Sequence, residues 1–227
     1  MSVDTTVGFR VTIWNGDSTF QPAVFLLSIF YHIQKKLCHF LGIFIEAIWA
    51  GTAAMVKNDG KQSNEAAFWK KFSDIYGEKA LADKPLFDEF YEKEFQKAKK
   101  LCKVNPKAEI AVHTVKEMGF RVALATNPIF PASATESRIR WAWLKPNDFE
   151  LYTTYENIGY CKPNPDYYRE ISKRLGVAPE QCLMVGNDVT EDMIAETVGM
   201  KVFLLSDCLI NKENEMQFVL LPLFDHM

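Results

Sequence analysis

Apolar and polar positions alternate along the second half of the chain in the pattern of an α/β protein. Short apolar runs bounded by glycine or polar residues predict buried strands of a parallel sheet at residues 120–125, 151–154, 181–185 and 201–205. Stretches with helical spacing predict helices at residues 106–118, 132–144 and 166–175, and a further helix from Met193 to Gly199. This alternation from residue 105 to 205 indicates a doubly wound parallel sheet.

The first half of the chain has a different pattern. Residues 7–14, VGFRVTIW, are β-branched and aromatic and predict one strand that stands apart from the others. From residue 22 to about residue 102 the spacing is helical nearly throughout, with turns at Asp59–Gly60 and Tyr76–Gly77. We therefore expect a helical block of domain size inserted after the first strand. Its aromatic residues are predicted to be core residues, among them Trp49, Trp69 and Phe72.

Composition limits the classes of function. The chain is 48% apolar and 24% charged with a net charge of −3, which argues against a nucleic-acid binder. Five cysteines without a CxxC pair predict reduced, mostly buried thiols in the cytoplasm, and four scattered histidines give no zinc pattern. The apolar run at residues 23–33 is too short to span a bilayer and has no cleavage site after it, so we interpret it as a buried helix.

The candidate chemistry lies where predicted strands end. Parallel strands place their carboxyl ends on one edge of a sheet, so polar groups that follow them can converge there. The groups are acids, a hydroxyl beside an amide, and a lysine in a proline-bounded loop, which together suit phosphoryl transfer. They are Asn15, Asp17, Ser18 and Thr19 after the first strand, Thr126 and Asn127 after the second, Lys162, and Asn187, Asp188 and Asp192.

Each group also has a purely structural interpretation. Residues 15–17 can cap a turn, and Thr126–Asn127 can be an ordinary end of a strand. Lys162 taken alone is typical of a solvated surface lysine. Asp188 and Asp192 suit the dipole of a helix N-terminus as well as a divalent cation. The joint occurrence of these groups, in order and at strand ends, favours a site.

The order and spacing of these segments resemble the haloacid dehalogenase superfamily of phosphohydrolases. Residues 125–127 resemble its second motif, residues 161–165 its lysine motif, and residues 185–192 its acidic motif. The resemblance implies a Rossmann-type core formed by residues 1–20 and 103–227. It also implies an inserted cap domain of the all-helical kind at residues 21–102.

The first motif departs from the family pattern. In register, Asn15 stands where the family has its nucleophilic aspartate, while Asp17 matches the second aspartate and Thr19 is kept. An amide oxygen is a poor nucleophile and brings no charge to a metal. Three explanations remain open: a relative that binds without turnover, an engineered or deamidated residue, and an uncertain sequence in this N-terminal part.

The resemblance assigns roles to the remaining residues. Asn15 holds the nucleophile position, Asp17 is the general acid and base, and Lys162 neutralises the nucleophile and the phosphate. Thr126 and the Asn127 backbone bind phosphate oxygens. The implied magnesium set is Asn15, Asp17, Asp188 and Asp192, in which Asp192 holds either the water shell of the metal or Lys162, and Asn187 is a second candidate ligand.

The implied function is a magnesium-dependent phosphatase that acts on a small phosphorylated metabolite through an aspartyl-phosphate type mechanism. The alternative is a relative that binds phospho-ligands without hydrolysing them, because position 15 is asparagine. A dehalogenase is disfavoured by the acidic turn, and a receiver-like protein by the large helical insert. We expect a monomer or homodimer, with no nucleic-acid or membrane partner.

Overall fold

The computed structural model describes residues 6–9, 41–102 and 104–210. They form a five-stranded sheet in the order β3-β2-β1-β4-β5, with every neighbouring pair parallel. The strands are β1 (Thr6–Phe9), β2 (Arg121–Leu124), β3 (Leu151–Tyr152), β4 (Cys182–Gly186) and β5 (Lys201–Leu204). The predicted doubly wound parallel sheet is confirmed. The expected continuation of the first strand through residues 10–14 lies outside the described residues.

The helices follow the sequence pattern with two differences. They are α2 (Leu41–Val56), α3 (Asn64–Tyr76), α4 (Lys84–Glu92), α5 (Pro106–Glu117), α6 (Ala132–Trp141) and α7 (Pro165–Leu175). The predicted helix 132–144 ends earlier, at Trp141, because Trp143 takes a left-handed conformation with φ 64° that a helix cannot continue through. The segment after Met193 forms a 3₁₀ helix, η5 (Met193–Val198), which Gly199 ends with φ 96°.

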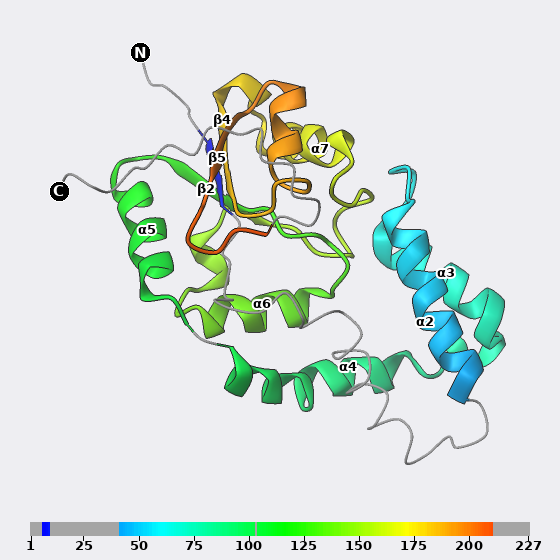
Figure 1. Cartoon of the computed structure of the whole chain (residues 1–227). Coiled ribbons are helices and arrows are strands. Elements are labelled where there is room, and N and C mark those ends of the chain that lie inside the picture. Colours follow the sequence, from blue (N-terminus) through cyan, green and yellow to red (C-terminus); the bar gives the residue numbers. More distant parts are fainter. Residues whose placement is uncertain (1–5, 10–40, 103, 211–227) are drawn as a thin grey trace.

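The sheet is covered on both faces. Side chains alternate along β2: Val122 and Leu124 pack with Val112 of α5 and with α6, whereas Ala123 packs with α7. Figure 1 shows α5 and α7 on opposite sides of the strands. Because successive side chains of β2 point to opposite faces of the sheet, the core around the sheet consists of two layers, one on each face.

Residues 41–102, here called the helical region, contain helices only among their described residues. Besides α2, α3 and α4 they include the 3₁₀ segments η1 (Glu78–Ala80) and η2 (Phe95–Leu101). Its core is a group of aromatic rings in which Phe72 contacts Phe44, Phe68 and Phe87 at centroid distances of 5.6 to 5.7 Å. Figure 1 shows α2 and α3 side by side at one end of the molecule.

Of the three aromatic residues expected in this core, one is not buried. Trp69 and Phe72 are buried, but Trp49 is 44% exposed. The buried face of α2 carries Phe44, Ala47 and Ile48. Residue 49 is turned about 100° away from residue 48 on the same helix, so it leaves that face. The prediction for Trp49 was wrong because the aromatic type was weighed above its place in the helical period.

The sequence predicts mostly buried thiols and no membrane-spanning segment. Cys161 and Cys182 are buried and Cys102 and Cys208 are half-buried, while Cys38 lies outside the described residues. Among the helices that the structure describes, none combines the length and the apolar character that a membrane span requires.

Candidate active site

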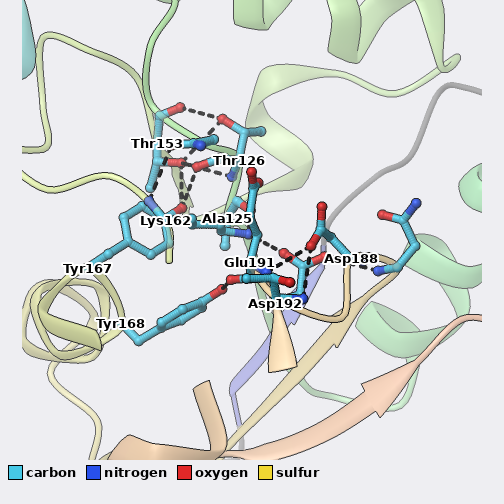
Figure 2. A network of polar contacts seen from close by, with 12 residues as sticks. Ala125, Thr126, Thr153, Lys162, Tyr167, Tyr168, Asp188, Glu191 and Asp192 are labelled. Carbon is cyan, nitrogen blue, oxygen red and sulfur yellow. Dashed lines mark hydrogen bonds and ion pairs between the residues drawn. The ribbon is translucent and has the colours of Figure 1, made fainter. Parts of the chain in front are cut away.

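Four of the predicted site residues come together at the carboxyl edge of the sheet. Figure 2 shows Thr126, Lys162, Asp188 and Asp192 in one network of polar contacts. Asn15, Asp17, Ser18 and Thr19 lie outside the described residues. The strand before them, β1, ends at Phe9, which pairs with Leu124 of β2 and Val185 of β4. Thr126 therefore follows β2, and Asp188 and Asp192 follow β4, which are the two strands that flank β1, while Lys162 lies in the loop between β3 and α7.

Lys162 and Asp192 form the buried centre of this network. The Lys162 Nζ lies 2.6 Å from Asp192 Oδ1, and both side chains are 0% exposed. Nζ also donates to the carbonyl oxygen of Ala125 at 2.8 Å, directly after β2. Buried charges are tolerated only when such partners replace water. The contacts thus fix the ammonium group at the end of β2.

The other oxygen of Asp192 is held by the backbone. The N–H groups of Asn187 and Asp188 both donate to Asp192 Oδ2 at 3.0 Å. A Cβ added at Gly186 would collide with this carboxylate, so the close approach requires glycine. Asp192 therefore engages both of its oxygens with Lys162 and the turn after β4, as expected for a residue that holds the lysine.

Asp188 and Asn187 differ in their surroundings. Asp188 is 1% exposed, and its Oδ1 accepts hydrogen bonds from the N–H groups of Thr190 at 3.0 Å and Glu191 at 2.8 Å. Asn187 donates from Nδ2 to the carbonyl oxygen of Cys208 at 2.6 Å. The amide is thus oriented toward the chain that follows β5, while Asp188 keeps a carboxylate, the ligand type that hard cations prefer, in the turn.

Thr126 and Asn127 form a turn that is tied to β3 and to the lysine loop. The Thr126 N–H donates to Thr153 Oγ1 at 2.9 Å, and the Thr126 hydroxyl donates to the Thr153 carbonyl oxygen at 3.1 Å. Asn127 Oδ1 accepts from the N–H of Lys162 at 3.3 Å. A phosphate at this turn would compete with Thr153 for the hydroxyl of Thr126.

Two tyrosines of α7 that sequence reasoning missed donate hydrogen bonds to the backbone of the site. Tyr167 donates from its hydroxyl to the Thr126 carbonyl oxygen at 2.5 Å, and Tyr168 donates to the Glu191 carbonyl oxygen at 2.6 Å. The Nζ of Lys162 lies 5.5 Å and 5.6 Å from the two ring centroids, within the range of cation–π contact. The available signal was their position as adjacent tyrosines in the first turn of the helix after Lys162.

Cys161, next to Lys162, is not a candidate nucleophile. It is 1% exposed, and burial raises the pKa of its thiol to about 12. The thiolate is the reactive form of cysteine, so this thiol is inert at neutral pH.

The described part of the site supplies one cation and the carboxylates of Asp188 and Asp192. Within residues 6–9, 41–102 and 104–210, no group of three or more His, Cys, Asp and Glu side chains is placed to hold a metal ion. The remaining members of the predicted metal set, Asn15 and Asp17, lie outside these ranges.

Known proteins are similar to this chain in sequence and in fold. A family model described as haloacid dehalogenase-like hydrolase matches residues 25–195. The chain is 28% identical over 155 residues to the "Putative phosphatase YhcW" of Bacillus subtilis (strain 168), covering 64% of this chain and 66% of that protein. It is 30% identical over 102 residues to the glyceraldehyde 3-phosphate phosphatase of Methanothermobacter thermautotrophicus, covering 44% of each.

A solved structure shares the fold. The crystal structure of a HAD phosphatase from Thermococcus onnurineus is similar with a TM-score of 0.51 and 19% identity, over 88% of this chain and 86% of that chain. The two matches to curated relatives are shorter and span about two thirds and less than half of the length of those proteins.

Proposed function

Because the chain belongs to the haloacid dehalogenase-like hydrolases, we propose that it is a magnesium-dependent phosphatase acting on a small phosphorylated metabolite. The single observation that carries this proposal is the buried Lys162–Asp192 pair, which joins the turn after β4 to the end of β2 beside Thr126. Its two curated relatives carry phosphatase names, which supports the same chemistry.

In this proposal the residues of the chain divide the work. Lys162 offsets the negative charge of the phosphoryl group, and Asp192 keeps the ammonium group in place. Thr126 and the backbone at Asn127 donate to phosphate oxygens, with Thr126 exchanging its bond to Thr153 for one to the ligand. Asp17 serves as general acid and base for the leaving group and then for water.

The donor set fits magnesium. Asp188 offers a carboxylate in a turn, and Asp17 and Asn15 add oxygen donors from the first motif, which is the ligand chemistry that a hard divalent cation takes. When bound, the ion would offset phosphate charge and orient the phosphoryl group. Asp192 contributes through Lys162, since both of its oxygens have partners in the protein.

The proposed arrangement of domains follows the sequence. Residues 1–20 and 103–227 form the core domain with the site, and residues 21–102 form an all-helical cap. A cap that closes over the carboxyl edge of the sheet excludes water from the reacting phosphate.

A second function is favoured by Asn15 itself. A chain with an amide at the nucleophile position can keep the phosphate site and bind a phospho-ligand without hydrolysing it. In this alternative Lys162, Thr126 and Asp188 keep their roles in binding, and no covalent intermediate forms.

The experiment that separates the two is hydrolysis of 4-nitrophenyl phosphate, with and without magnesium, by the chain with Asn15 and by Asn15→Asp. Mass spectrometry of the N-terminal peptide verifies residue 15 in each sample. We expect Asn15→Asp to turn over the ester only with magnesium, and the Asn15 chain to be slower by roughly a thousandfold or more.

Two results would contradict these proposals. Absence of turnover by Asn15→Asp removes the phosphatase. Hydrolysis by the Asn15 chain at a rate close to that of Asn15→Asp, with deamidation excluded by mass, removes the binding-only alternative.

A further inference from the structure

Asn64, the first residue of α3, is buried where the helical region contacts the loop after β2 and the loop before α7. Its side chain is 0% exposed. Its Nδ2 donates to the carbonyl oxygens of Pro128 at 3.0 Å and Tyr160 at 3.4 Å, and to Cys161 Sγ at 3.3 Å. One amide group from the helical region therefore contacts chain segments that are 64 to 97 residues away in sequence.

These segments are the two loops of the candidate site. Pro128 directly follows the turn of Thr126 and Asn127, and Cys161 directly precedes Lys162. The loops also touch each other where the Lys162 N–H donates to Asn127 Oδ1 at 3.3 Å, a long hydrogen bond. Asn64 adds a second bridge between them.

The chemistry of the contact selects an asparagine. Its Oδ1 accepts from Asn58 Nδ2 at 2.9 Å, and Asn58 Nδ2 also donates to the Gln62 carbonyl oxygen. This bond turns the NH₂ group of Asn64 toward the two loops, where it meets acceptors only. An aspartate would place oxygen against oxygen at this point, and an alanine would leave the acceptors without a donor.

The backbone at Asn64 also forms hydrogen bonds to the segment that precedes Lys162. The N–H groups of Asn64 and Glu65, at the start of α3, donate to the carbonyl oxygens of Ile158 at 2.9 Å and Tyr155 at 2.7 Å. A Cβ added at Gly159 would lie 2.5 Å from the Gln62 carbonyl oxygen. The beginning of α3 and the segment before Lys162 are therefore in direct backbone contact.

We propose that Asn64 is a positioning residue that sets the spacing between the Thr126–Asn127 turn and Lys162 and couples both to the helical region. The part of this inference that concerns phosphate binding rests on the proposed function. A displacement of the start of α3 would reach Pro128 and Cys161 through one side chain, so the helical region and the phosphate site would move together.

The test compares Asn64→Ala with Ser63→Ala. Ser63 caps the same helix by accepting from the Ala66 N–H at 3.2 Å, and among the described residues its side chain forms no hydrogen bond to the two loops. Both variants weaken the start of α3, but only Asn64→Ala removes the bridge. Amide hydrogen exchange at Ile129 and Lys162 reports on the two loops, and calorimetry with inorganic phosphate and magnesium reports on the site.

We expect Asn64→Ala to speed exchange at both amides by about tenfold and to weaken phosphate binding by a similar factor. Ser63→Ala should change neither by more than about twofold. Equal exchange in the two variants, or unchanged phosphate affinity in Asn64→Ala, would overturn the inference.

Two further results are also decisive. If Asn64→Ala does not fold, Asn58→Ala takes its place: it releases the orientation of the Asn64 amide, and faster exchange at Ile129 and Lys162 than in Ser63→Ala is required. If the parent chain binds no phosphate, the proposed function fails. In that case the exchange rates alone decide whether Asn64 positions the two loops.

Discussion

An ion pair lies at each end of β2, one at the carboxyl edge of the sheet and one at the amino edge, and the two pairs differ in their exposure to solvent. At the carboxyl edge, Lys162 and Asp192 are 0% exposed. At the amino edge, Arg121 at the start of β2 pairs with Glu150 just before β3, and these side chains are 31% and 45% exposed. Arg121 Nε donates to Glu150 Oε2 at 2.7 Å.

The difference shows that the desolvation of charged groups is concentrated at the carboxyl edge of the sheet. A pair in water gains little, because solvent screens it and two long side chains must be ordered. A buried pair has lost its water, so each partner depends on the other and on nearby dipoles. The amino-edge pair is a surface contact between neighbouring strands. The carboxyl-edge pair holds charge in the protein interior, which is expected of a site more than of a scaffold.

The largest effect should come from breaking the buried pair. Lys162→Met keeps much of the side-chain volume but leaves the Asp192 carboxylate buried without its cation, and it removes the donor to the Ala125 carbonyl oxygen. We expect the free energy of unfolding to fall by about 3–5 kcal/mol. Urea denaturation at neutral pH measures it.

The matched control is the double variant Lys162→Met with Asp192→Asn. An amide at position 192 carries no charge, and its oxygen can still accept from the N–H groups of Asn187 and Asp188. The double variant should therefore be more stable than Lys162→Met alone. A loss below about 1 kcal/mol in Lys162→Met would contradict burial of the pair.

An intermediate effect should come from Tyr167→Phe. The change keeps the ring beside Lys162 but removes the hydroxyl that donates to the Thr126 carbonyl oxygen and contacts Thr153 Oγ1. We expect the free energy of unfolding to fall by about 1–2 kcal/mol, since the Thr126 carbonyl oxygen and the buried Thr153 hydroxyl each lose one hydrogen-bond partner. Tyr168→Phe is the comparison, because it removes a hydroxyl that donates to the Glu191 carbonyl oxygen and leaves the Thr126 turn untouched. Thermal unfolding of both variants provides the measurement, and equal stability of Tyr167→Phe and the parent would refute the role of the hydroxyl.

The sequence predicts β2 and β4 well because both strands are buried on both faces. The runs at residues 122–125 and 182–185 are continuous and apolar and end in polar residues or glycine, so β2 and β4 lie within the predicted ranges or one residue beyond them. The early end of α6 could not be predicted, because the left-handed Trp143 follows no local rule for tryptophan.

The sequence predicts those site residues that follow a strand or lie in the loop after one. Thr126, Lys162 and Asp188 each follow a predicted strand or lie in a proline-bounded loop, and strand direction alone places such groups on one edge. Tyr167 and Asn64 were not predicted as site residues. Each acts through contacts with distant backbone carbonyls, and the local pattern gives a tyrosine in a helix or an asparagine at a helix start an ordinary structural role.

The smallest effect should come from the exposed pair at the amino edge. The hydrogen bond and charge of Arg121 hold the pKa of Glu150 below its ordinary value. A carboxylate whose pKa is lowered in the folded state stabilises the fold fully at pH values above its pKa in the unfolded chain, which is about 4.3. This contribution is lost as the pH falls through the pKa of the folded state. Glu150→Gln should therefore cost at most about 0.5 kcal/mol at pH 6, because solvent screens the pair. The difference from the parent should shrink toward pH 3.5 in urea denaturation. A difference that stays constant over this range, or that exceeds the effect of Tyr167→Phe, would erase the contrast between the two edges.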